Sequence, residues 1–351
     1  MRRHGRTAIG IILSVLLLWW ALRDVSPAEV LREIASADPL LFLLSILIAL
    51  AGFWFRAVRW GVFLTPIEVG IPLHPRLAAT FIGFAANNVL PARIGEVVRA
   101  FSLSKLTPVT ISAAFATLVM ERLFDALVLV GLLFAAMAMP RFPAAASVGG
   151  VDVQAGAIFL GTLMATVAAA LYVVVAAPRF AARVAERASQ LLPQRLRAPV
   201  LEALRGFARG LGVLKSGKLF LVSALLALGQ WLFLAVSFLV GFRAFGIDHV
   251  PFTGAVFLQS LISLAVAIPS SPGFFGPFEA AARVGLGLWN VPPGQAISFA
   301  IGFHIAGFLP VVLIGAWYLW RTDVSWADLS RSGSTTTAEQ GDLEWRGEEL
   351  K

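Results

Sequence analysis

Long apolar stretches with few charged residues dominate the chain. A helix needs roughly 20 residues to cross about 30 Å of hydrocarbon, and several stretches reach that length. We therefore predict membrane-spanning helices at 7–22, 39–64, 108–139, 156–177, 218–242 and 294–320.

Two further apolar regions, 77–105 and 252–290, are interrupted in the middle by proline, glycine and polar residues. As a helix the arm 77–90 would be only about 21 Å long, and Pro91 ends it. A Pro-Ser-Ser-Pro-Gly run breaks the second region. Both patterns predict re-entrant hairpins, because irregular backbone is tolerated at membrane depth only when buried in protein or lining a water-filled cavity. The predicted fold class is an all-α polytopic membrane protein with about six full spans and two such hairpins.

The basic residues favour this topology. If both hairpins return to the side from which they enter, most arginines and lysines, including those of the Arg-rich stretch 178–217, lie in the cytoplasm, as the positive-inside rule requires. Segment 7–22 is then a retained anchor, since no small-residue cleavage site follows it. The predicted organisation is a transmembrane domain over 1–321 and a disordered polar tail over 322–351, with both termini cytoplasmic.

The same topology makes the first hairpin and its flanking spans run opposite to the second hairpin and its spans. Such an inverted repeat is typical of transporters whose substrate site lies near the midplane among broken helices. Each hairpin also carries proline and glycine four residues apart, followed by glutamate and arginine. These residues are Pro91, Gly95, Glu96 and Arg99 in the first hairpin, and Pro272, Gly276, Glu279 and Arg283 in the second.

The amino-acid composition argues against a soluble protein. The 351 residues are 58% hydrophobic and 14% charged, against roughly 25% charged in soluble domains. The chain has no cysteine, which excludes disulfides, thiolate catalysis and cysteine zinc sites. The net charge of +8 indicates contact with anionic lipid rather than nucleic acid, because the basic residues flank apolar segments. The sequence shows no metal cluster, phosphate-binding loop or nucleophile elbow, so we expect no enzyme activity, catalytic residue, metal or cofactor.

Ionised side chains within apolar segments are the candidate site, since each costs on the order of 2.5–3.5 kcal/mol at the bilayer centre. Glu121 and Asp125 share one face of their helix and need cationic partners. They form either a structural ion-pair lock or a proton-coupled or cation-coupled gate. The possible partners are Arg56, Arg59, Arg93 and Arg99, although Arg56 and Arg59 could instead extend to lipid phosphates at the inner helix end.

Side chains in the two hairpins complete this candidate site. Amides and arginines in the first suit a phosphate or carboxylate, unless its charged residues only pair with one another at the surface. In the second, Glu279 could lie at the outer interface, and His304 in the last span is either a packing residue or a coupling group. The predicted substrate-binding residues are Asn87, Asn88, Arg93, Glu96, Arg99, Glu121, Arg122, Asp125, Ser271, Gly273, Gly276 and Glu279, with helix breaks at Pro91, Gly95, Pro269 and Pro272.

Four segments carry a resemblance to a known family. FRAVRW, NNVLPARIGEVVRAFSLSK, MERLFDALVL and SSPGFFGPFEAA occur in this order. With them, nearly all of 7–320 resembles the flippase-like membrane proteins related to the transmembrane region of lysylphosphatidylglycerol synthase, the multiple peptide resistance factor. Two residues depart from the pattern: Phe274 stands where a second glycine is usual, and Pro277 precedes the Glu279 turn. We expect no aminoacyltransferase domain after the last span, so the resemblance implies the translocating half alone.

The expected function is a lipid flippase that moves a phospholipid, glycolipid or isoprenoid-type lipid across a bacterial inner membrane. Its headgroup would enter a polar cavity between the hairpin tips, and its partners would be the bilayer, the lipid, and a second copy or lipid-biosynthesis proteins. One alternative is an intramembrane lipid-modifying transferase with Glu121 or Asp125 as general base. The other is a non-transporting scaffold that docks a lipid-synthesis complex through 178–217, which otherwise predicts an amphipathic helix on anionic lipid.

Overall fold

The computed structural model describes residues 2–90, 94–140, 216–267 and 271–322, with scattered positions between 142 and 197. The predicted span 156–177, the stretch 178–217 and the predicted tail lie largely outside these residues. The described elements are α1 (Arg2–Leu22), α2 (Pro27–Ser36), α3 (Pro39–Leu64), α4 (Leu73–Val89), α5 (Gly95–Leu106), α6 (Ile111–Met137), β1 (Ser147–Val148), β2 (Val151–Asp152), α11 (Gly217–Ala244), α12 (Phe252–Ala265), the 3-10 turn η2 (Pro272–Phe274), α13 (Pro277–Gly287) and α14 (Pro293–Arg321).

Three described helices have the length and composition of a membrane span. They are α3, α11 and α14, each with a mean hydropathy of 2.2 over an 18-residue window, and α1 and α2 add a fourth candidate bent by 74°. Helix α6 has 27 residues but carries three charged side chains near its centre. The chain is therefore a helical polytopic membrane protein, and the full count of six spans and two re-entrant hairpins stays a prediction.

The helices begin where the sequence offers a cap. Asp38 accepts hydrogen bonds from the backbone N–H groups of Leu40 and Leu41, each at 2.9 Å, at the start of α3. Thr110 and Ser216 cap α6 and α11 in the same way. Such caps satisfy the free N–H groups of the first turn. Large apolar side chains on the outer faces remain exposed, as expected of surfaces that contact lipid; they include Leu43, Leu47, Trp54, Leu225, Leu313 and Trp320.

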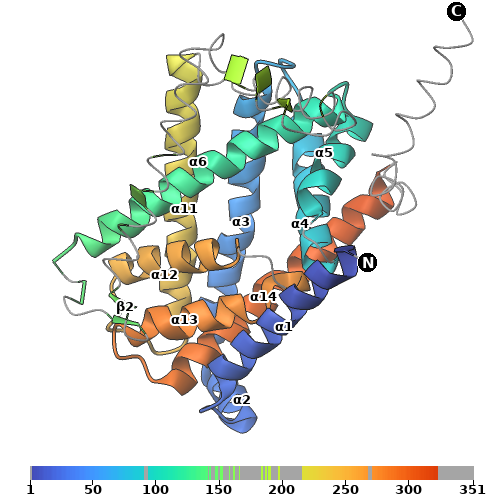
Figure 1. Cartoon of the computed structure of the whole chain (residues 1–351). Helices are drawn as coiled ribbons and strands as arrows, with labels where there is room; N and C mark the ends of the chain where they lie inside the picture. Colours follow the sequence, from blue (N-terminus) through green and yellow to red (C-terminus); the bar gives the residue numbers. More distant parts are fainter. Residues whose placement is uncertain are drawn as a thin grey trace, which may run out of the picture.

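Helices α3 and α11 lie side by side along most of their length, and α6 crosses them (Figure 1). Helix α4 turns back into α5, so the first broken region is a helical hairpin packed on itself and on α14. Its tight contact depends on Gly95, where a Cβ atom would lie 2.2 Å from the carbonyl oxygen of Gly83. Strands β1 and β2 form a short antiparallel pair, in which Ser147 faces Asp152 and Val148 faces Val151. Apart from this pair, the described elements are helical.

The second broken region consists of α12, η2 and α13. Helices α12 and α13 pack together, and η2 packs against α4, so the turn of the second broken region lies against the first helix of the first. Helix α1 runs along α13 (Figure 1). The two helices touch at Gly276, whose φ is +98° and whose added Cβ would lie 2.3 Å from the carbonyl oxygen of Ser14. The contact between α4 and η2 within the helix bundle is what positions the candidate site.

Candidate functional site

Five charged side chains form a buried ion cluster between α3, α5 and α6. None of the five is more than 7% exposed: Arg56, Arg59, Arg99, Glu121 and Asp125. Three guanidinium groups face two carboxylates, so one formal positive charge remains. Buried charges are tolerated when they are paired and hydrogen-bonded, and α6 brings both carboxylates to one face because they are one turn apart.

Glu121 lies at the centre of this ion cluster. Arg99 binds it with both ends of its fork, Nη1 to Oε1 at 2.9 Å and Nη2 to Oε2 at 3.2 Å. Arg56 donates from Nη1 to the same Oε1 at 2.9 Å. The Arg99 guanidinium also lies over the Trp60 ring, 4.1 Å from its centroid, and Trp60 is itself held by a hydrogen bond from Nε1 to Thr117 at 2.9 Å. The carboxylate is thus fixed by two other elements of the bundle.

Asp125 is bound from three sides. Arg56 Nη1 donates to Oδ2 at 3.2 Å, and the indole N–H of Trp231 on α11 donates to Oδ1 at 3.0 Å. Arg59 Nη1 lies 2.6 Å from Oδ1, but its contact has the distance of an ion pair without the angles of a hydrogen bond. Arg122 is 39% exposed and pairs at 3.4 Å with Glu96 at the edge of the ion cluster.

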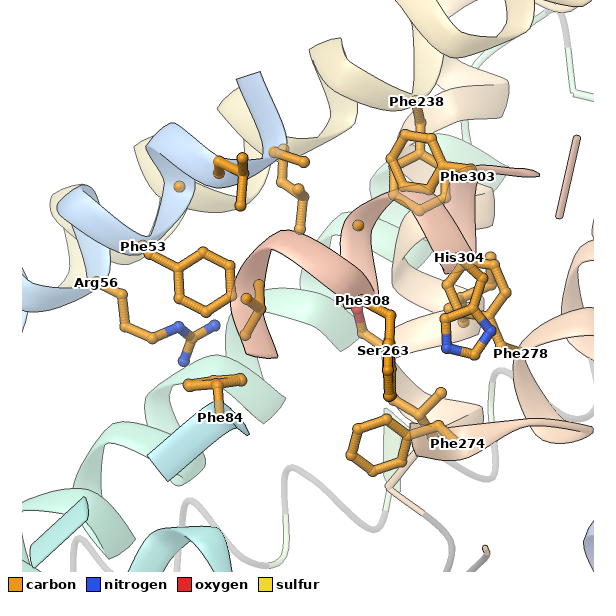
Figure 2. Close-up of a pocket in the computed structure, with 18 of the residues that line it drawn as sticks. Phe53, Arg56, Phe84, Phe238, Ser263, Phe274, Phe278, Phe303, His304 and Phe308 are labelled. Carbon is orange, nitrogen blue, oxygen red and sulfur yellow. The ribbon is translucent and has the colours of Figure 1, made fainter. Parts of the chain in front are cut away.

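A cavity of about 270 Å³ lies between α3, α4, α11, α12, α13 and α14. Arg56 stands at one end and His304 at the other, and the walls between them are aromatic and aliphatic (Figure 2). Along α3 and α14 the lining extends for about two turns, or roughly 11 Å. Mostly apolar walls with a few polar groups are typical of ligand sites.

Several polar groups on this cavity keep hydrogen-bonding capacity that no contact among the described residues uses. One Arg56 nitrogen, Nη1, carries both of its hydrogen bonds to carboxylates, which leaves further N–H donors of its five. Gln230 is 2% exposed, and its side-chain oxygen lacks a hydrogen bond among the described residues. Asn88 lines the same end. These groups can receive a polar ligand without breaking an existing contact.

The other end of the cavity holds a second buried pair. Glu279, fully buried, accepts from the Gly276 N–H at 2.7 Å and lies 2.7 Å from Nδ1 of His304. The imidazole is stacked between Phe275 and Phe278, at 4.6 and 4.3 Å between ring centroids. A carboxylate on Nδ1 leaves Nε2 as the nitrogen that can face the cavity.

The structure brings together most of the residues predicted from sequence. Arg99, Glu121 and Asp125 share the ion cluster, Asn88 lines the cavity, and Asn87 supports the first hairpin by accepting from the Gly95 N–H at 2.8 Å. In the second hairpin Ser271, Gly273 and Gly276 form the turn around η2. Pro91, Arg93 and Pro269 lie outside the described residues.

Three alternatives that the sequence left open are now decided. Arg56 and Arg59 do not extend to lipid phosphates: they are buried in the ion cluster because Glu121 and Asp125 need cations. Glu279 is buried on His304 and not at an interface. Glu96 and Arg99 do not pair with each other, since the helix directs Arg99 inward and Glu96 outward to Arg122.

Sequence reasoning missed Trp60, Trp231 and Gln230. A tryptophan in an apolar helix is commonly an interface anchor, so nothing local marked either indole as a buried donor. The pairing of Glu279 with His304 was also missed, although both had been singled out separately. An acid and an imidazole in different segments of one membrane domain are the only sequence signal for that pair.

The fold and the site define an integral membrane protein with a buried ion cluster beside a mostly apolar cavity between its helices. More specifically, the chain matches the family described as the lysylphosphatidylglycerol synthase TM region over residues 7–315, and it belongs to that family. It is 26% identical to a UPF0104 membrane protein of Methanothermobacter thermautotrophicus, over 90% of this chain and 92% of that protein. A second UPF0104 membrane protein of the same organism is 24% identical over 90% of this chain and 94% of its own length.

The chain is also similar to a protein named glycosyltransferase AglD of Haloferax volcanii. The two are 26% identical over 86% of this chain, which spans about half, 52%, of that protein. The prokaryotic relatives and the apolar helices agree with a place in a cell membrane.

Proposed function

We propose that this protein is a lipid translocator, without enzyme activity, that carries a phosphate-bearing lipid across the cell membrane. The phosphate would bind at the Arg56 end of the cavity, and the acyl or isoprenoid chains would stay in the bilayer. The observation that carries the proposal is the guanidinium of Arg56, which belongs both to a cluster with one excess positive charge and to the cavity wall.

Charge and geometry both favour a phosphate. The ion cluster attracts an anion, and arginine N–H groups form strong charge-assisted hydrogen bonds with phosphate oxygens. Asn88 and Gln230 supply amides near the same end. The meeting of two broken helices resembles the substrate sites of transporters, where interrupted helices surround the substrate. A phospholipid or an isoprenoid phosphate fits this chemistry better than a neutral glycolipid.

The transferase alternative finds less support in the geometry. A general base needs a free lone pair within reach of a proton on the substrate, whereas Glu121 and Asp125 each accept from two or more cationic or indole donors. The scaffold alternative concerns 178–217, which lies largely outside the described residues.

Reconstitution into vesicles tests the proposal. Wild-type protein should move phosphatidylglycerol labelled on an acyl chain between leaflets faster than protein-free vesicles do, and faster than a labelled glycosyldiacylglycerol that lacks phosphate. Arg56→Lys should slow phosphatidylglycerol, because lysine loses the fork that binds phosphate and carboxylate together. Arg243→Lys is the matched control, since Arg243 pairs with Asp248 at a partly exposed position and lies outside the cavity lining. No movement of either lipid across a range of pH and potential, or equal movement of both, would overturn the proposal.

A further inference from the structure

Phe274 has a backbone conformation that phenylalanine rarely adopts. Its φ is +63°, and the preceding residue, Gly273, has φ +70°. A positive φ is unstrained for glycine but brings the Cβ atom of a bulky residue against its own backbone. A strained residue at a cavity is grounds for asking what its side chain does there.

The turn around Phe274 is held from both sides, which explains why the strained conformation persists. The Ser271 N–H donates to the Ser14 hydroxyl at 2.7 Å, and the Phe274 N–H donates to the Ser271 carbonyl at 3.2 Å. Downstream, the Gly276 N–H is bound to Glu279 at 2.7 Å. Hydrogen bonds to α1 and α13 therefore fix the backbone at 274, whichever side chain is attached.

A comparison within the chain shows that the strain is not a requirement of the turn alone. The other described residue with positive φ that is not glycine is Asn290, at +58°. Asparagine tolerates this conformation well, and Asn290 is outside the cavity lining. At 274 a glycine or an asparagine would satisfy the same backbone, so the backbone conformation does not require a phenyl ring at this position.

The ring of Phe274 lines the cavity (Figure 2). It comes from η2, the turn at which the second broken region packs against α4 of the first. The cavity, which is partly open, has a volume of about 270 Å³, slightly below the roughly 300–1,000 Å³ of most ligand pockets. A ring placed at the junction of the two breaks reduces the room for a headgroup at that point.

We propose that Phe274 is a size-selecting residue, which limits the lipid headgroups that can occupy the cavity to small ones. The inference rests on the proposed lipid translocation and adds a specificity determinant to it. The backbone network supplies the conformation, and the phenyl ring supplies the steric limit.

The experiment compares Phe274→Gly, Phe274→Ala and Asn290→Gly with wild type in vesicles. The probes are acyl-labelled phosphatidic acid, which has the smallest phosphate headgroup, and acyl-labelled phosphatidylinositol, which is bulky. Both Phe274 variants should raise the phosphatidylinositol rate relative to phosphatidic acid by roughly ten-fold or more, as steric discrimination by one side chain allows. Asn290→Gly removes a positive-φ side chain elsewhere and should leave the ratio unchanged.

The two Phe274 variants separate the ring from the strain. Alanine removes the ring but keeps a Cβ at positive φ, whereas glycine removes both, so equal ratios in the two variants support the steric role. Wild-type ratios in both variants, with protein that elutes as a single species, would overturn it. Native mass spectrometry of bound phosphatidic acid and phosphatidylinositol measures the same preference by occupancy. The two readouts separate the two proposals. A wild type that binds lipid but moves none refutes translocation. Variants whose binding preference equals that of wild type refute the role of Phe274.

Discussion

The two broken regions use the same residue types in opposite ways. In the first, Arg99 is buried in the ion cluster and Glu96 is on the exposed side, with side-chain exposures of 2% and 25%. In the second, Glu279 is fully buried on His304, and Arg283 is partly exposed, bound to Asp24 and to the last carbonyls of α1. A similar sequence pattern thus buries a cation in the ion cluster at the first broken region and a carboxylate paired with His304 at the second. The cavity itself is lined by Arg56 of α3 at one end and by His304 of α14 at the other.

This difference gives the cavity a direction. In the proposed function a headgroup phosphate would meet the guanidinium of Arg56 on α3, and its remaining polar groups would meet the imidazole of His304 on α14. The lining extends for roughly 11 Å along each of these helices, so a ligand that reached both groups would be oriented and not merely attracted. The different use of glutamate and arginine in the two broken regions therefore gives the two ends of the cavity different chemical surroundings.

The largest effect is expected from exchanging the two arginines for methionine. Arg99→Met leaves Glu121 short of its two-point partner in a buried site, and removing one partner of a buried pair costs about 3–5 kcal/mol. Arg283→Met removes hydrogen bonds at a partly exposed site and should cost about 1–2 kcal/mol. Thermal unfolding in detergent, followed by size-exclusion fluorescence, measures both. Equal losses in the two variants would mean that the burial difference between the hairpins has no energetic consequence.

A smaller effect is expected from the two glutamates. Glu279→Gln replaces a carboxylate that accepts from a backbone N–H and faces an imidazole, and it should cost about 1.5–2 kcal/mol. Glu96→Gln changes a partly exposed ion pair, and such pairs are worth about 1 kcal/mol or less. The same unfolding assay, with phosphatidylglycerol movement as a second readout, compares them. A larger loss of stability in the Glu96 variant than in the Glu279 variant would contradict the expectation that the buried glutamate contributes more.

The smallest effect concerns pH and the outer contact of the second hairpin. The hydrogen bond from Arg283, together with Arg23, lowers the pKa of Asp24 below its ordinary value. The contact therefore stabilises the fold above the unfolded pKa of about 3.9, and this contribution is lost as the pH falls through the lower folded pKa. The stability difference between wild type and Asp24→Asn should shrink on acidification from pH 6 to below pH 4. If the stability difference between wild type and Asp24→Asn does not change with pH, the ion pair between Asp24 and Arg283 does not stabilise the fold.

Much of the arrangement could be predicted from local signals. Proline and glycine mark the breaks, and Glu121 and Asp125, one turn apart in an apolar helix, require buried cations. Which arginines supply them could not be decided, because Arg56 and Arg59 near a helix end fit burial and lipid contact equally well. The two indole donors and the aromatic stack on His304 depend on distant helices meeting, which no local pattern specifies. Phe274 was noticed as a departure from the family pattern, but its positive φ is visible only in the structure.

The attachment of α1 to the second hairpin has a consequence for biosynthesis. Ser14 binds the N–H of Ser271, 257 residues later in the chain, and the Trp20 and Ala21 carbonyls are bound by Arg283. Helix α1 therefore completes these hydrogen bonds only after the chain has been synthesised as far as residue 283. Contacts this distant in sequence form late and slowly, so the face of α1 that packs on α13 stays without its protein partner until α13 has been made.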